Sequence, residues 1–384
     1  MPEFIAGAKL SELFFFEAVR PLIAARFPDL ACSAGLIGAG SEVLGFDTEM
    51  SRDHGWGPRV MLFLGEDDHA RRAAAIHELL RNELPHTFRG YPTSFTPPDP
   101  ADNGTQLLQA VSEGPVNHRV DLLTIRGFLL AYLNFDLERA PEPADWLTFP
   151  EQKLRTLTVG PVFQDEVNLE PARARFAYYP HEVWLYLLAS GWARIGQEEH
   201  LMGRAGLVGD EIGSALIGAR LVRDLMRLCF LMERQYAPYP KWFGSAFSRL
   251  QCAPDLAPAL RAVQLAATWQ ARERHLVDAY EYVAGMHNRL GMTEPIPAKA
   301  EPFFGRPLRV IWGDRRAGAL RARISDPTLL RLARRRPIGG IDQFSDSTDL
   351  LEDTSRRPAL RLLYEQDSAH PGQLTPTTAQ KRET

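Results

Sequence analysis

The spacing of apolar residues divides the chain into two parts, one with predicted strands and helices and one that is mainly helical. Near the N-terminus, apolar residues at helical spacing predict helices over 8–27 and 69–84. Short apolar runs bounded by Gly, Pro and Asp predict buried strands at 31–37, 59–64 and 118–125, with a hairpin at 87–91. Beyond residue 147 the apolar residues recur mainly at helical spacing. The pattern predicts an α+β fold, in which a small mixed β-sheet is followed by a larger all-helical domain.

The helical segments set the expected domain limits. Helices are predicted at 127–135, 151–158, 181–194, 212–236, 243–250, 256–290 and 328–334, with one short strand at 308–312. The Pro-rich segment 138–147 is the expected linker, so the sheet domain covers 1–137 and the helical domain 148–369. Residues 370–384 are polar and contain Pro, which is typical of a disordered tail.

Composition narrows the class of protein. A net charge of −4 over 384 residues gives no reason to expect a nucleic-acid partner. Three scattered cysteines are too few for a disulfide framework or a thiolate metal site. No apolar run reaches the length of a membrane span, and no basic stretch precedes an apolar core at the N-terminus, so we expect a cytoplasmic protein. The sequence indicates no oligomeric state.

A glycine-serine turn followed by acidic residues is the first candidate site. Gly40 and Ser41 follow the first predicted strand, Asp53 precedes the second, and Asp121 lies within the third. Small residues let a backbone and a hydroxyl approach a triphosphate, and strand carboxylates can hold a divalent cation against it. Glu49 is a further candidate metal ligand. This order of residues suits nucleotidyl transfer.

The same residues also have plain structural explanations. Gly40 and Ser41 could form an ordinary turn, Asp53 could cap a helix or turn, and Asp121 could face water from an edge strand. Metal sites of this kind usually carry carboxylates on alternate residues, so that both side chains leave a strand on one face. Here the residue two positions after Asp53 is Gly55.

A second group of candidates lies in the helical half. Glu198 is a candidate general base, whereas Arg204 and Lys241 are candidate phosphate-binding residues. The alternatives are a surface ion pair for Glu198 and a solvated lysine for Lys241. The basic run 331–336 and the oxygen-rich segment 342–349 are better explained as a solvated helix end and as turn or capping residues.

Several sequence blocks together resemble a known family. They are GSEVLGFD, SRDHGWGPR, YPHEVWLYLLA, RIGQEEHLMGR, VGDEIGS, PYPKWFGSAF, HNRLGMT and IDQFSDSTDLL, between about residues 40 and 351. The chain resembles a bacterial domain-of-unknown-function family placed in the DNA-polymerase-beta-like nucleotidyltransferase superfamily. The resemblance implies that Gly40 and Ser41 cradle a triphosphate, that Asp53 binds metal and that Asp121 is the third carboxylate. The family pattern reads Asp-His-Asp at 53 to 55, from which Gly55 departs.

Three hypotheses follow from the resemblance and from this departure. The first is an enzyme that uses Mg²⁺ and ATP, or another nucleoside triphosphate, to transfer a nucleoside monophosphate to a small-molecule acceptor. The second is a catalytically degenerate protein that binds a nucleotide or another small molecule. The third is a biosynthetic enzyme on this fold that no longer needs the metal.

Overall fold

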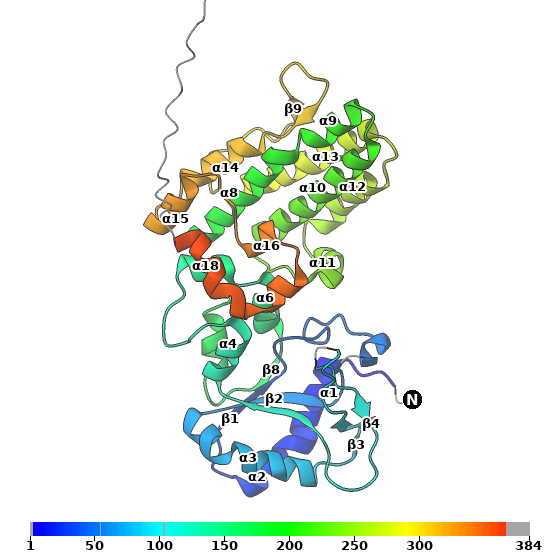
Figure 1. Cartoon of the computed structure of the whole chain (residues 1–384), viewed down its shortest axis with the longest axis vertical. Helices are drawn as coiled ribbons and strands as arrows, with labels where there is room; N and C mark the ends of the chain where they lie inside the picture. Colours follow the sequence, from blue (N-terminus) through cyan, green and yellow to red (C-terminus); the bar gives the residue numbers. More distant parts are fainter. Residues whose placement is uncertain (1–2, 54, 103, 366–384) are drawn as a thin grey trace, which may run out of the picture.

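A computed structural model describes residues 3–53, 55–102 and 104–365, without the side chain of Asp53. Figure 1 shows a sheet with its helices at one end of the molecule and a longer helical part at the other. This is the predicted α+β architecture, with a small mixed sheet and a larger helical part. The predicted tail, 370–384, lies outside the described residues.

Four strands form the main sheet. They are β1 (Cys32–Gly35), β2 (Arg59–Leu64), β7 (Arg119–Leu123) and β8 (Val162–Gln164), in the order β7-β2-β1-β8. β1 pairs antiparallel with β2 and β8, whereas β2 and β7 are parallel, with Met61 opposite Asp121. The prediction missed β8, which follows a helix of the other half and adds three residues to the edge of the sheet.

The two faces of the sheet join different cores. Val60, Leu62 and Leu64 pack with the helices on one face, namely α1 (Gly7–Phe14), α2 (Arg20–Arg26) and α3 (Glu66–Glu83). A π-helical turn, Phe15–Val19, joins α1 to α2. Met61 and Phe63 alternate to the other face, where Phe63 meets Phe128 of α4 (Ile125–Leu133) at 5.6 Å between ring centroids. This second face therefore faces the helical part.

The helical part is built around three long helices, α8 (His181–Glu198), α10 (Glu211–Met232) and α13 (Trp269–Arg289). The helices around them are α5 (Pro143–Thr148), α6 (Glu151–Val159), α7 (Leu169–Ala174), α9 (Leu201–Leu207), α11 (Pro240–Phe247), α12 (Ala253–Leu265), α14 (Gly313–Arg321), α15 (Pro327–Ala333), α16 (Ile341–Phe344), α17 (Thr348–Glu352) and α18 (Arg357–Glu365). Short strands form three small pairs: β3 (Thr87–Phe88) with β4 (Tyr91–Pro92), β5 (Ser94–Phe95) with β6 (Leu108–Gln109), and β9 (Glu301–Pro302) with β10 (Arg309–Val310).

Two segments differ from the prediction. The single helix expected over 256–290 is wrong, because α12 ends at Leu265 and α13 begins at Trp269. Thr268 caps α13 by accepting a hydrogen bond from Ala271 N, which stabilises a helix start at this position. The expected linker, 138–147, contains the start of α5 and packs Asp145 in the interior with Arg139, Arg357 and Arg361. The predicted domain limits themselves stay predictions.

A membrane-spanning segment was not expected from the sequence. Across the described ranges, no helix combines the length and the apolar character that crossing a bilayer requires.

Candidate functional site

The turn after β1 requires glycine at position 40. Gly40 has φ of +143°, a conformation that side chains other than glycine rarely adopt. A Cβ atom there would lie 2.7 Å from Arg59 Nη2 and 2.7 Å from Glu42 Oε2. Glycine is therefore needed at this position because an ion pair approaches the backbone closely, whether or not the turn binds a ligand.

The turn also leaves hydrogen-bond donors unused. The N–H groups of Leu44 and Phe46 donate to Ser41 O, which folds residues 41–46 back on themselves. By contrast, the N–H groups of Ser41 and Val43 and the Ser41 hydroxyl donate to no atom within the described part of the chain. Free backbone N–H groups in a turn favour an anion, so this turn has donors that a phosphate group could use.

An ion pair fastens the turn to β2. Arg59 Nε donates to Glu42 Oε1 at 3.0 Å, and Arg59 Nη2 donates to the carbonyl of Ala39 at 2.9 Å. Only 12% of the Arg59 side chain and 6% of the Glu42 side chain are exposed. Because the pair is buried, removing one partner would leave an uncompensated charge against the turn.

Asp121 and Arg119 lie on the same face of the sheet as Arg59. Their positions on β7 alternate toward the helical part, and the parallel register sets Arg119 opposite Arg59. Burial lowers the pKa of Arg119, the nearby Arg59 lowers it further, and Asp121 and Glu42 oppose both effects. Within the described ranges, the side chains of Arg119 and Asp121 make no hydrogen bond or ion pair, and the Arg119 guanidinium group lies 5.8 Å from the centroid of the Phe95 ring.

Position 55 faces Arg119. Gly55 has φ of +60°, and a Cβ atom there would lie 3.7 Å from Arg119 Nη1. A carboxylate at this position would therefore point at a guanidinium group. With glycine at position 55, that guanidinium group has no carboxylate neighbour from this position.

The predicted metal ligands are only partly described. Glu49 is exposed at the start of a 3₁₀ turn, Glu49–Asp53, and the backbone of Asp53 ends that turn. The Asp53 side chain and His54 lie outside the described residues. In the part of the chain that the structure describes, no three His, Cys, Asp or Glu side chains gather as metal ligands. The metal site predicted at Asp53, Asp121 and Glu49 therefore stays a prediction.

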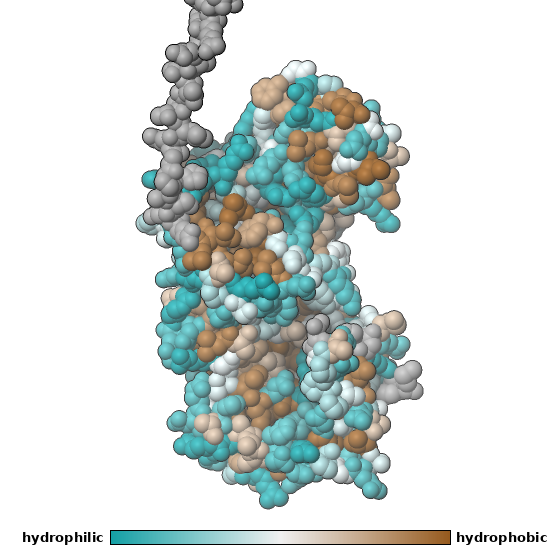
Figure 2. Space-filling view, viewed as in Figure 1, coloured by the Kyte–Doolittle hydropathy of each residue, from teal (hydrophilic) through white to brown (hydrophobic). Residues whose placement is uncertain are grey.

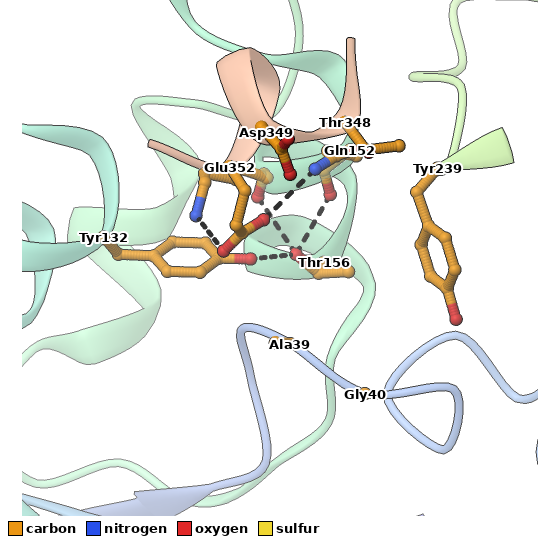
Figure 3. Close-up of a pocket in the computed structure, with 10 residues that line it drawn as sticks. Ala39, Gly40, Tyr132, Gln152, Thr156, Tyr239, Thr348, Asp349 and Glu352 are labelled. Atoms are coloured by element: carbon orange, nitrogen blue, oxygen red, sulfur yellow. Dashed lines mark hydrogen bonds and ion pairs between the residues drawn. The ribbon is translucent and has the colours of Figure 1, made fainter. Parts of the chain in front are cut away.

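A cavity of about 430 Å³ separates the Gly40 turn from the helical part. Figure 3 shows Ala39 and Gly40 on one side, facing Thr156 and Glu352 across the opening, with Tyr239 at its edge. The lining residues come from the turn, α4, α6, the start of α11 and α17: Ala39, Gly40, Tyr132, Gln152, Lys153, Thr156, Tyr239, Thr348, Asp349 and Glu352.

Lys153 provides the positive charge of this cavity. Its side chain is only 5% exposed, and Nζ lies 2.7 Å from Glu352 Oε1 and 4.4 Å from the centroid of the Tyr132 ring. Gln152 Nε2 also donates to Glu352, at 3.2 Å. These contacts tie α17 to α6. The Tyr132 hydroxyl lies 2.6 Å from Thr156 Oγ1, and burial raises the pKa of Tyr132 well above its usual value, so Tyr132 stays neutral.

Helix α11 closes one side of the cleft and contacts the turn directly. Trp242 stacks on Phe46 with ring centroids 5.2 Å apart, and Arg249, which follows the end of the helix at Phe247, donates to the carbonyl of Gly45 at 2.9 Å. Lys241 is exposed on this helix, two residues from the cavity-lining Tyr239, with Nζ 5.1 Å from the Trp242 ring centroid. Among the candidates of the helical half, Lys241 is therefore the one that lies beside the cleft.

Glu198 and Arg204 lie elsewhere. Glu198 is buried at the end of α8, where it forms ion pairs with Arg220 and Arg194. Arg204 is exposed on α9, which Figure 1 places at the end of the helical part that is far from the sheet. The structure does not bring either residue to the Gly40 turn.

Sequence reasoning missed most of the cavity wall. Gln152, Lys153 and Glu352 were not singled out, and Asp349 was included only in a segment assigned to turn and capping residues. Lys153 carried one usable signal, because a lysine on the buried face of a predicted helix needs an acidic or aromatic partner.

Comparison with known proteins adds two likenesses. A family model described as Domain of unknown function (DUF4037) matches residues 146–243, which include the cavity residues of α6 and α11. A comparison with curated proteins found no match. A solved structure of a nucleotidyltransferase-like protein from Exiguobacterium sibiricum is similar at 12% sequence identity and a TM-score of 0.30, over 71% of this chain and 75% of that one. A likeness of that size carries no argument about function, and the family match covers a minority of the chain.

Proposed function

We propose that the protein binds a nucleoside triphosphate in the cleft and transfers its nucleoside monophosphate to a small-molecule acceptor. One observation carries the proposal. The turn at Gly40 and Ser41 has unused N–H groups and a hydroxyl beside a cavity lined by a buried lysine, Lys153, whose partner is Glu352. Phosphoryl and nucleotidyl transfer depend mainly on positioning phosphates and balancing their charge, which such groups can do.

The reaction would proceed by attack of an acceptor oxygen on the α-phosphorus. A new P–O bond forms, the bond to the β-phosphate oxygen breaks, and pyrophosphate leaves. The acceptor proton would pass to a cavity carboxylate, Asp349 or Glu352. Mg²⁺ at Asp53, Asp121 and Glu49 remains a prediction, and no step is assigned to it because the described residues do not gather as its ligands.

Calorimetric titration with ATP and the other nucleoside triphosphates, with and without Mg²⁺, tests this proposal. Lys153→Met should weaken nucleotide binding about tenfold or more, since a charge-assisted contact is lost. Lys9→Met is the matched control, because Lys9 is 59% exposed on α1 and its loss should change nothing. Lys241→Met asks whether the exposed lysine beside the cleft also contributes. Pyrophosphate release with candidate acceptors then measures transfer, and the absence of binding by any nucleotide would exclude the proposal.

Binding without transfer is the second candidate, and Arg119 favours it. This guanidinium group has no ion-pair partner among the described residues, stands beside Asp121 and faces Gly55. A positive charge there repels a metal ion and attracts a phosphate group. Nucleotide binding that is independent of Mg²⁺ and is lost in Arg119→Gln would support this candidate over transfer.

The substitution Gly55→Asp separates the two candidates further. Its φ of +60° suits aspartate better than most residues, so the variant should fold. If transfer is the function, Gly55→Asp should raise pyrophosphate release and Asp53→Asn should abolish it. If the protein only binds nucleotide, the new carboxylate should pair with Arg119 and weaken binding without producing pyrophosphate.

A further inference from the structure

Apolar side chains are exposed at the end of the helical part that is far from the cleft. Figure 2 shows hydrophobic residues gathered over this end, where Figure 1 places α9 and α12. The exposed fractions are 46% for Leu207, 82% for Val208, 78% for Ile212, 64% for Leu216 and 75% for Leu265. They belong to the end of α9, the start of α10 and the end of α12.

The start of α10 carries these residues as a regular stripe. Ile212, Ala215, Leu216 and Ala219 follow the spacing of one helix face, and Ala215 is exposed while Ala219 is half-buried. The opposite face packs inward through Ser214, Gly218 and Leu221. The stripe is therefore a surface of a helix whose other side is already fixed in the core.

The helix is anchored where the stripe begins. Glu211 accepts a hydrogen bond from Trp269 N at 3.0 Å, and Arg272 donates to Ser214 Oγ at 2.6 Å. The Asp210 side chain caps the helix by accepting from Gly213 N at 2.7 Å. The stripe is thus a rigid surface rather than a fraying end.

We propose that this stripe is the interface of a homodimer, in which α10 packs antiparallel against α10 of a second copy. The charges at the two ends of the stripe make it complementary to itself. Asp210 and Glu211 precede the stripe, and Arg220, which is 49% exposed beside its partner Glu198, follows it. A two-fold axis near Ala215 and Leu216 sets the acidic end of each helix against the basic end of the other.

The residue types on the stripe fit such a pairing. Ile212 of one copy meets Ala219 of the other, so a large side chain faces a small one at each end. The alanines allow close approach of the helices, while the leucines meet near the axis. Antiparallel helices also align their dipoles favourably. Because Figure 1 places this end far from α4 and α6, whose residues line the cavity, dimerisation leaves the cleft of each copy open.

Disulfide trapping tests the geometry. The cysteines of the chain, Cys32, Cys229 and Cys252, are all buried, so an added cysteine on the surface can be oxidised selectively. Ala215→Cys should form a covalent dimer of twice 43.1 kDa under mild oxidation, since a disulfide needs Cα atoms within about 7 Å. Ala75→Cys, exposed on α3 at the sheet end, is the matched control and should remain monomeric.

Sedimentation equilibrium of the full chain tests the energetics, over about 1 to 100 µM. Leu216→Lys should raise the dimer dissociation constant about 100-fold or more, because the side chain is buried twice in a symmetric interface. Leu130→Lys, 42% exposed on α4, should leave it unchanged. Three results would each overturn the proposal: a monomer across the whole concentration range, a dimer that persists in Leu216→Lys, or no disulfide at position 215 in a protein that does dimerise. A monomer throughout would instead suggest that the stripe binds a different protein.

Discussion

Replacing Gly40 by alanine tests how the turn before the cleft is held. The new Cβ would lie 2.7 Å from Arg59 Nη2 and from Glu42 Oε2, and 2.8 Å from Glu42 Cδ. The φ of +143° adds conformational strain of about 1–3 kcal/mol. Displacement of a largely buried ion pair adds to this, so Gly40→Ala should lower the free energy of unfolding by about 2–4 kcal/mol in total.

Gly45 provides the control in the same turn. Its φ is +65°, but a Cβ there would meet nothing within 4 Å, so Gly45→Ala should cost only the left-handed strain of about 1–2 kcal/mol. Urea unfolding of both variants, followed by circular dichroism, measures the difference. Equal losses of stability in the two variants would refute the assignment of Gly40 to the ion pair. A loss of nucleotide binding in Gly40→Ala but not in Gly45→Ala would indicate that the ion pair of Arg59 and Glu42 positions the turn for nucleotide binding.

Two further predictions concern buried charges. Burial raises the pKa of Glu199 to about 7, although its carboxylate accepts hydrogen bonds from the N–H groups of Ile311, Trp312 and Gly313. Since its pKa in the folded state exceeds the unfolded value near 4.5, its stabilising effect is complete below pH 4.5 and is lost as the pH rises through 7. The stability difference between the wild-type protein and Glu199→Gln should therefore change by up to about 3 kcal/mol between pH 4.5 and 8, as measured by unfolding at each pH; a constant difference would contradict it. Asp145 is fully buried, and although burial opposes it, hydrogen bonds from Arg139 and Arg361 hold its pKa below its usual range. Asp145→Asn should lower the unfolding free energy by about 3–5 kcal/mol, because the buried Arg357 and the largely buried Arg361 lose their counter-charge, and a loss below about 1 kcal/mol would argue against that role.

The sequence predicted the elements that continuous patterns define. The run Arg59–Leu64 is apolar from end to end after its first residue, and β2 has those bounds in the structure. Strand β8 has three residues, and its partner in β1 lies about 130 positions earlier, so nothing local distinguishes it. The break between α12 and α13 was missed because helical spacing continues across it, and the cap at Thr268 is visible only once both helices are placed.

The candidate site likewise contains residues that local sequence signals reveal and residues that only the fold brings together. Gly40 and Ser41 were found because a small-residue turn after a strand is a local signal. The other wall of the cavity depends on contacts such as that between Lys153 and Glu352, which are 199 positions apart. Sequence spacing alone cannot predict a contact between residues so far apart in the chain. The prediction for Glu198 relied on helical neighbours alone, and the structure gives this residue arginine partners far from the turn.

The charges on the inner face of the sheet bear most directly on function. Arg59 is paired with Glu42, whereas Arg119 has no ion-pair partner among the described residues and lies 5.8 Å from the centroid of the Phe95 ring. A guanidinium group keeps its charge at any physiological pH, so Arg119 can attract an anionic group in addition to Asp121. A carboxylate at position 55 could be that group, but glycine cannot. A phosphate group on a bound ligand can balance Arg119, and the same charge disfavours a metal ion at Asp121. Glycine at position 55 thus gives Arg119 no acidic neighbour there, and the dependence of nucleotide affinity on Mg²⁺ is the measurement that would distinguish cation binding from anion binding at this face.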